Sequence, residues 1–313
     1  MNEQKNSLRQ KALLFFSVSA GIALISIALH TVNLLCFFEA SIGYYLRGAF
    51  LPILEWIVLG ITVVALLALS IVFFRKQPIA YEKKAPVWVR IGAALGAIGF
   101  GALVLSDGKS YLAALEELAE NGSATGLIPI LLGLGATVYF VLIALNGKNE
   151  GLRILTGFCV ILRLLSTLSN SYFDFTVPMN APVKLTLQLG ILSAILFLIN
   201  ELRATVASPR PSLYMFFAGI ATVCLGVSSL PSLVASYHGI FISEGEIYCY
   251  YALLGLFLYV TLRFLSLSLS PMREEADTEA LQITEQTQNA ETTEIDNRTV
   301  ESEDIAEDKK EEL

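Results

Sequence analysis

The stretch that decides the fold is Gly151–Arg203, GLRILTGFCVILRLLSTLSNSYFDFTVPMNAPVKLTLQLGILSAILFLINELR. Two apolar runs flank a polar, proline-containing corner at residues 173–182. Each run has close to the roughly 20 residues that a helix needs to cross about 30 Å of hydrocarbon. The first run carries Arg163 near its middle, and a charged side chain at that depth must face protein or water. We therefore predict two transmembrane helices joined outside the membrane.

Polar residues recur at helical spacing along both predicted helices, which places them on one face of each. In the first helix this face holds Arg163, Ser166, Thr167, Asn170 and Asp174. In the second it holds Asn180, Lys184 and Gln188. The two polar faces meet at the corner, so we expect a polar cluster there.

The composition is that of a membrane protein. Hydrophobic residues make up 55% of the 313 residues, charged residues make up 16%, and the mean hydropathy is +0.64. These values argue against two soluble domains, although the length alone would allow them. The net charge of −7 arises from Met272–Leu313, which holds 15 acidic and 4 basic residues. No concentrated basic face exists, so nucleic-acid binding is not expected.

The fold class that we predict is all-α, a polytopic bundle of eight transmembrane helices with short loops. Residues 1–11 form a cytoplasmic N-terminal segment, residues 12–271 the transmembrane domain, and residues 272–313 a disordered acidic tail. The predicted spans are 12–38, 50–74, 87–106, 126–145, 152–170, 182–202, 213–237 and 247–269. In the outer loop, the segment Tyr111–Glu120 is predicted to form either an acidic interfacial helix or an ordinary solvated helix. Glu201 and Arg203 are expected to extend towards the interface.

Loop charges predict the orientation. With eight spans and a cytoplasmic N-terminus, 14 lysines and arginines fall on the cytoplasmic side and three on the outside. This distribution follows the positive-inside rule. Both termini are then cytoplasmic, and we expect an integral protein of the plasma membrane.

The candidate site is a layer of polar residues at matching depth in the outer half of the spans. His30, Asn33, Glu55 and Arg163 fall roughly 7 to 12 Å below the outer ends of their helices, given 1.5 Å per residue. The sequence predicts that Glu55 pairs with Arg163 and that His30 or Asn33 adds a hydrogen bond. One interpretation makes this layer the floor of an outward-facing pocket. The other makes it an ion pair that fixes helix register and binds nothing.

In the pocket interpretation, Arg163 anchors an anion and Glu55 is its counter-charge. The other predicted ligand-binding residues are Asn170, Asp174, Asn180 and Lys184. No metal or other cofactor is expected, because the four cysteines lack metal-ligand spacing and two histidines alone make no metal site. No nucleophile motif with a matching histidine is present, so an enzyme is not the favoured prediction.

The sequence thus predicts recognition or transport of a small polar or anionic solute at an intramembrane polar site. The alternative is a non-catalytic membrane scaffold or assembly subunit that acts through partner contacts. The expected partners are the lipid bilayer, a small polar or anionic ligand, and a protein that binds the acidic tail.

Overall fold

The computed structural model describes residues 2–40, 42–75, 85–118, 126–147, 149–175, 177–178, 180–206, 210–240 and 244–269. Within these ranges the protein is all-α, with one short hairpin. All eight helices are long and apolar enough to cross a membrane. The predicted tail at 272–313 lies outside the described residues.

The helices follow the predicted spans closely. They are α1 (Asn2–Cys36), α2 (Phe50–Phe74), α3 (Val87–Leu118), α4 (Leu127–Ala144), α5 (Glu150–Phe173), α6 (Pro182–Val206), α7 (Pro211–Tyr237) and α8 (Glu244–Leu269). Local sequence sets several starts: the Asn149 side chain accepts a hydrogen bond from the Leu152 N–H at α5, and Pro211 begins α7. Both are residues that helix N-termini favour.

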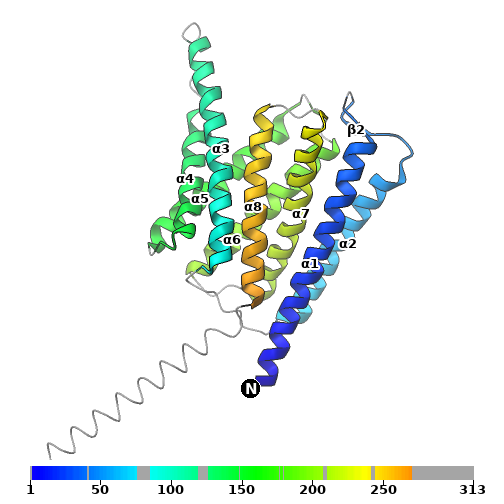
Figure 1. Cartoon of the computed structure of the whole chain (residues 1–313), viewed down its shortest axis with the longest axis vertical. Helices are drawn as coiled ribbons and strands as arrows, with labels where there is room; N and C mark the ends of the chain where they lie inside the picture. The colour runs from blue at the N-terminus through cyan, green and yellow to red at the C-terminus, as the bar shows by residue number, and fades with distance from the viewer. Residues whose placement is uncertain are drawn as a thin grey trace, which may run out of the picture.

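Most boundaries differ from the prediction by a few residues, and the start of α1 and the end of α3 differ the most. The segment 2–11 belongs to α1 instead of preceding it, and α3 continues without a break to Leu118. The described part of Tyr111–Glu120 is helical, as predicted, but it forms the last two turns of α3 and not a helix within a loop. In Figure 1 this part of α3 extends beyond the neighbouring helices.

Six helices form a closed ring, because each of α3, α4, α5, α6, α7 and α8 contacts the next and α8 contacts α3. The helices α1 and α2 pack together outside this ring, where α1 contacts α7 and α8 and α2 contacts α7 (Figure 1). The most buried helix is α7, with 78% of its most apolar stretch buried, against 28% for α1 and α2.

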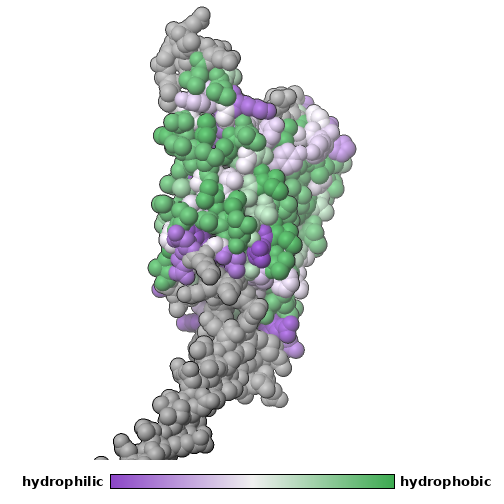
Figure 2. Space-filling model, turned by 60° about the vertical axis from the view of Figure 1, so that its left-hand side comes forward, coloured by the Kyte–Doolittle hydropathy of each residue, from purple (hydrophilic) through white to green (hydrophobic). Residues whose placement is uncertain are grey.

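Apolar side chains dominate the outside of the bundle. Figure 2 shows a broad hydrophobic band along the helices, with hydrophilic residues concentrated towards the two ends of this face. Exposed leucine, isoleucine and valine side chains occur on every helix from α1 to α6. A surface of this kind is suited to lipid and would be unfavourable in water.

Glycines bring α3 and α8 into backbone contact. A Cβ atom built at Gly99 would lie 2.7 Å from the carbonyl oxygen of Tyr251, and one built at Gly255 would lie 2.7 Å from that of Leu95. Both distances are too short for any larger residue. Small residues allow membrane helices to approach in this way.

A two-stranded hairpin follows α1, with β1 (Phe38–Glu39) antiparallel to β2 (Tyr44–Tyr45). Gly43 in its turn has a φ of +70°, which favours glycine, and a Cβ built there would lie 3.6 Å from Pro178 of the α5–α6 corner. The hairpin thus connects the α1–α2 pair to that corner. We call this end of the bundle the hairpin end.

Candidate functional site

The first polar group lies where α1 and α2 approach the hairpin. We call His30, Asn33, Glu55 and Tyr45 the His30 group. Asn33 Nδ2 donates a hydrogen bond of 2.6 Å to Glu55 Oε2, and His30 Nδ1 lies 2.6 Å from Glu55 Oε1. The Tyr45 hydroxyl lies 3.3 Å from His30 Nδ1 and 3.5 Å from Glu55 Oε2. Of the two residues expected to add a hydrogen bond in this layer, His30 or Asn33, Asn33 donates one to Glu55.

This group is almost completely buried. His30 and Asn33 are 0% exposed and Glu55 is 1% exposed, while Tyr45 is half-buried and reaches the surface. Burial, and then the neighbouring Glu55 carboxylate, raise the pKa of the Tyr45 hydroxyl above its usual value. Tyr45 therefore remains a neutral hydrogen-bonding group.

Several atoms near this level lack hydrogen-bond partners among the described residues. On α1 they are Ser26 Oγ, His30 Nε2 and Asn33 Oδ1, and on α7 Ser232 Oγ. Ser26, His30 and Asn33 have the spacing of one helical face. Buried polar groups are nearly always hydrogen-bonded, so unbonded ones indicate a missing partner such as water or a ligand.

The second polar group surrounds Arg163 of α5. Arg163 Nη2 lies 2.6 Å from Asp107 Oδ2 of α3, and Nη1 donates a hydrogen bond of 2.8 Å to Thr167 Oγ1. Arg163 is 5% exposed, and its Nε has no partner among the described residues. The guanidinium is therefore buried against protein, as its position in an apolar helix requires.

The predicted pairing of Glu55 with Arg163 was wrong. Glu55 is bound by His30, Asn33 and Tyr45, whereas Arg163 is bound by Asp107 and Thr167. The physical reason lies in the helix arrangement: α2 packs outside the ring against α1 and α7, while α5 is a ring helix that packs against α4 and α6. Matching depth did not bring the two side chains together.

Of the remaining predicted residues, Lys184 binds the α5–α6 corner and neither of these two groups. Lys184 is 5% exposed, and its Nζ donates to the carbonyl oxygens of Asp174 at 2.5 Å and Val177 at 3.3 Å. Lys184 thus ties the start of α6 to the α5–α6 corner. Asn170 and Asn180 are exposed. The eight predicted residues therefore do not form one site. They lie in the His30 group, around Arg163, and towards the α5–α6 corner.

A third polar group, at the opposite end of the bundle, was not predicted. Glu201 of α6 is 3% exposed and accepts hydrogen bonds from Tyr214 of α7 and from Tyr259 and Arg263 of α8. The expectation that Glu201 extends towards the interface was wrong, because its side chain is buried among these three partners. Both of its oxygens are bonded, so this group resembles a structural connection among three helices. The sequence offers no signal for it, because its four residues come from three separate helices.

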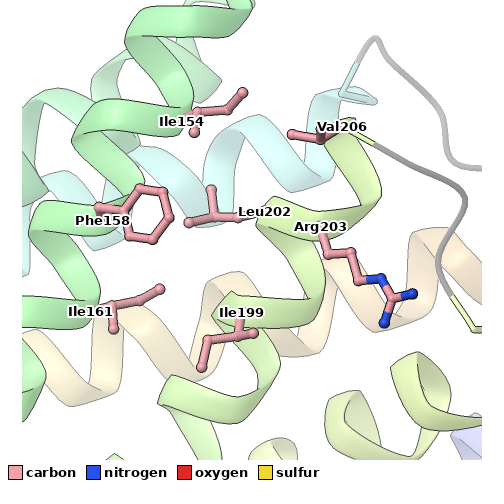
Figure 3. Close-up of a pocket in the computed structure, with 7 residues that line it drawn as sticks. All are labelled: Ile154, Phe158, Ile161, Ile199, Leu202, Arg203 and Val206. Carbon is pink, nitrogen blue, oxygen red and sulfur yellow. The ribbon is translucent and has the colours of Figure 1, made fainter.

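The structure also contains an apolar groove of about 220 Å³ between α5 and α6 (Figure 3). Its lining residues are Ile154, Phe158, Ile161, Ile199, Leu202, Arg203 and Val206. Arg203 is the only polar residue of this lining, so the groove suits hydrocarbon better than a polar solute. Among the described residues no cluster of histidine, cysteine and carboxylate side chains could hold a metal ion.

Of the three polar groups, the His30 group combines nearly complete burial of His30, Asn33 and Glu55 with the largest number of polar atoms that lack partners among the described residues. It is the best candidate for binding a small polar species. Comparison of the chain with protein-family models, with curated proteins and with solved structures finds no match.

Proposed function

We propose that the protein recognises or transports a small polar solute at a site that contains the His30 group. In this proposal the hairpin end faces the outside of the cell, both termini are cytoplasmic, and the membrane is the plasma membrane. The excess of lysine and arginine at the opposite end of the bundle supports that orientation.

The proposal rests on the buried polar atoms near the Glu55 carboxylate that have no hydrogen-bond partner among the described residues. A group that only fixed helix register would gain stability by bonding all its polar atoms, as the Glu201 group does. Near the His30 group, Ser26 Oγ, His30 Nε2, Asn33 Oδ1 and Ser232 Oγ have no protein partner among the described residues. Intramembrane ionisable residues commonly mark solute or ion pathways.

The geometry narrows the class of solute. Asp107 already neutralises Arg163 at 2.6 Å, so an anion could bind Arg163 only by competing with that carboxylate. Near Glu55, a negative charge would be repelled. A neutral or zwitterionic solute rich in hydrogen-bonding groups therefore suits the site better than a simple anion. Arg163 remains a second candidate binding residue through its unbonded Nε.

A thermal-shift screen tests the proposal. The purified full chain in detergent is heated with saturating amino acids, sugars, polyols and nucleosides, and a solute at 100 times its Kd should stabilise the fold by about 2.7 kcal/mol. Asn33→Leu should abolish that shift, whereas Lys109→Gln, which removes an exposed charge on α3, should retain it. A shift that survives in Asn33→Leu would place the solute elsewhere.

The scaffold function remains the second candidate, because the Glu201 group is fully bonded and the acidic tail is available in the sequence for a partner. That function predicts that removing residues 272–313 abolishes co-purification of a partner protein, while Glu55→Gln changes only stability. A solute shift that depends on Asn33 would favour the transport proposal over this one.

A further inference from the structure

In the described part of the chain, the His30 group contains a buried carboxylate, Glu55, without a fixed positive charge beside it. Glu55 is 1% exposed, and within the described residues no lysine or arginine forms an ion pair with it. Its partners are an imidazole, an amide and a phenol, none of which carries a fixed positive charge. With a neutral imidazole the group holds one buried negative charge, which a medium of low dielectric constant strongly disfavours.

One additional proton removes this charge without any other change. His30 Nδ1 lies 2.6 Å from Glu55 Oε1, off the direction of a straight hydrogen bond but well within ion-pair distance. Because Nδ1 faces the carboxylate, we assign the proton of the neutral ring to Nδ1. A second proton would then enter at Nε2, which has no partner among the described residues. The product is an imidazolium beside a carboxylate, with a net charge of zero.

Polar atoms without hydrogen-bond partners occur on α1 and α7 at about the level of Nε2, where a water molecule could deliver this proton. α1 and α7 run parallel, since Gly219 lies against Ser19 and Gly226 against Ile27. His30 and Asn33 are consequently level with residues 229–232 of α7. The unbonded atoms on the two helices include two hydroxyls and an amide oxygen. Buried water typically binds where about three such atoms are available.

The elements packed around the group offer few competing charges. In α7, no residue from Gly226 to Ser236 is titratable. On α6, Lys184 donates to two backbone carbonyls. The remaining titratable side chains at this end of α1, the hairpin and α8 include Cys36, Glu39, Tyr44, Arg47, Tyr248, Cys249, Tyr250 and Tyr251. Among the described residues, the polar contacts of His30 and Glu55 are with each other, with Asn33 and with Tyr45.

We propose that the His30 group is a proton-binding site, in which His30 Nε2 reversibly takes up one proton while Glu55 stays ionised as its counter-charge. Tyr45, the member of the group that reaches the surface, lies between it and the solution at the hairpin end. This inference rests on the proposed function in one respect only: in a transporter, the bound proton would be the coupling ion. Proton binding itself requires no solute.

The chain has two histidines, which makes the test direct. The second, His238, is exposed at the end of α7, so His238→Gln leaves His30 as the only imidazole. Full-length protein of this variant, labelled with ¹⁵N-histidine and held in detergent without solute, is followed by NMR from about pH 5 to pH 8. We expect Nδ1 to remain protonated throughout and Nε2 to gain one proton as the pH falls.

A second variant identifies the counter-charge. In His238→Gln with Glu55→Gln, the neutral amide supplies no counter-charge, so Nε2 should no longer gain a proton across this pH range. The proposal is overturned if Nε2 keeps one protonation state across the range in the first variant, or if Glu55→Gln leaves the step unchanged. A failed solute screen with an intact Nε2 step would reject the transport function and leave the proton site in place.

Discussion

Arg263 of α8 lies with its Nε 3.1 Å from Glu201 Oε1 of α6, and both side chains are 3% exposed. Tyr214 and Tyr259 bind the same carboxylate from α7 and α8. A buried ion pair of this kind often adds little net stability, but the loss of one partner is costly because the other charge stays buried. The pair should therefore respond very differently to single and double substitution.

Arg263→Met is expected to lower the free energy of unfolding by about 3–5 kcal/mol, because Glu201 would remain buried without its cation. Adding Glu201→Gln should recover part of that loss, since the amide carries no charge. Chemical unfolding of the purified protein in detergent measures both effects. Equal stability of the single and double variants would show that Glu201 is not held as an ion.

Asp107→Asn should destabilise the protein by a similar amount of about 3–5 kcal/mol, because it leaves the buried Arg163 guanidinium without a counter-charge. A double-mutant cycle tests the assignment of partners. Asp107 and Arg163 should show a coupling energy of about 0.5–3 kcal/mol, whereas Glu55 and Arg163 should be additive. Coupling between Glu55 and Arg163 would contradict the observed arrangement.

Gly99→Ala should destabilise the bundle by about 1–3 kcal/mol, because the new methyl group would meet backbone atoms of α8 that cannot move aside. The nearest such atom is the carbonyl oxygen of Tyr251 at 2.7 Å. Gly101→Ala is the matched control on the same helix, since its Cβ would lie 3.9 Å from Thr137 Cγ2. Thermal unfolding should show a lower Tm for the first variant and an unchanged or higher Tm for the second.

Tyr45→Phe should alter the stability of the protein at alkaline pH. The raised pKa of the Tyr45 hydroxyl means that the folded state holds this proton more tightly than the unfolded state. The stability that this proton contributes is fully present below the ordinary tyrosine pKa of 10.0. It is lost as the pH rises towards the pKa of Tyr45 in the folded state. The difference in unfolding free energy between wild type and Tyr45→Phe should therefore be constant below that value and shrink above it.

The number of helices and most helix bounds could be predicted, because the length of an apolar run decides them. The predicted bounds of α2, Phe50–Phe74, agree with the structure at both ends. The end of α3 could not be predicted from hydropathy. Asp107 lies beyond the predicted span 87–106, yet it continues the helix and forms an ion pair with Arg163. A charged residue at the end of an apolar run is typical of a loop, so hydropathy alone does not indicate Asp107 as the partner of Arg163.

The candidate site was predicted only in part. Matching depth placed Asn33 near Glu55 correctly, because their helices are adjacent in the chain and pack together. The same reasoning wrongly paired Glu55 with Arg163, because the depth of a residue in its helix does not determine which helices are neighbours. The Glu201 group depends wholly on contacts among α6, α7 and α8, and no spacing within one helix reveals such contacts.

The glycine contacts between α3 and α8 restrict how the protein can change shape. With each backbone pressed against the other at Gly99 and Gly255, neither helix can rotate about its own axis or slide along its neighbour without collision. The two helices must therefore be displaced together, as one rigid unit. Any alternation between inward-open and outward-open states would have to place its hinges elsewhere in the bundle.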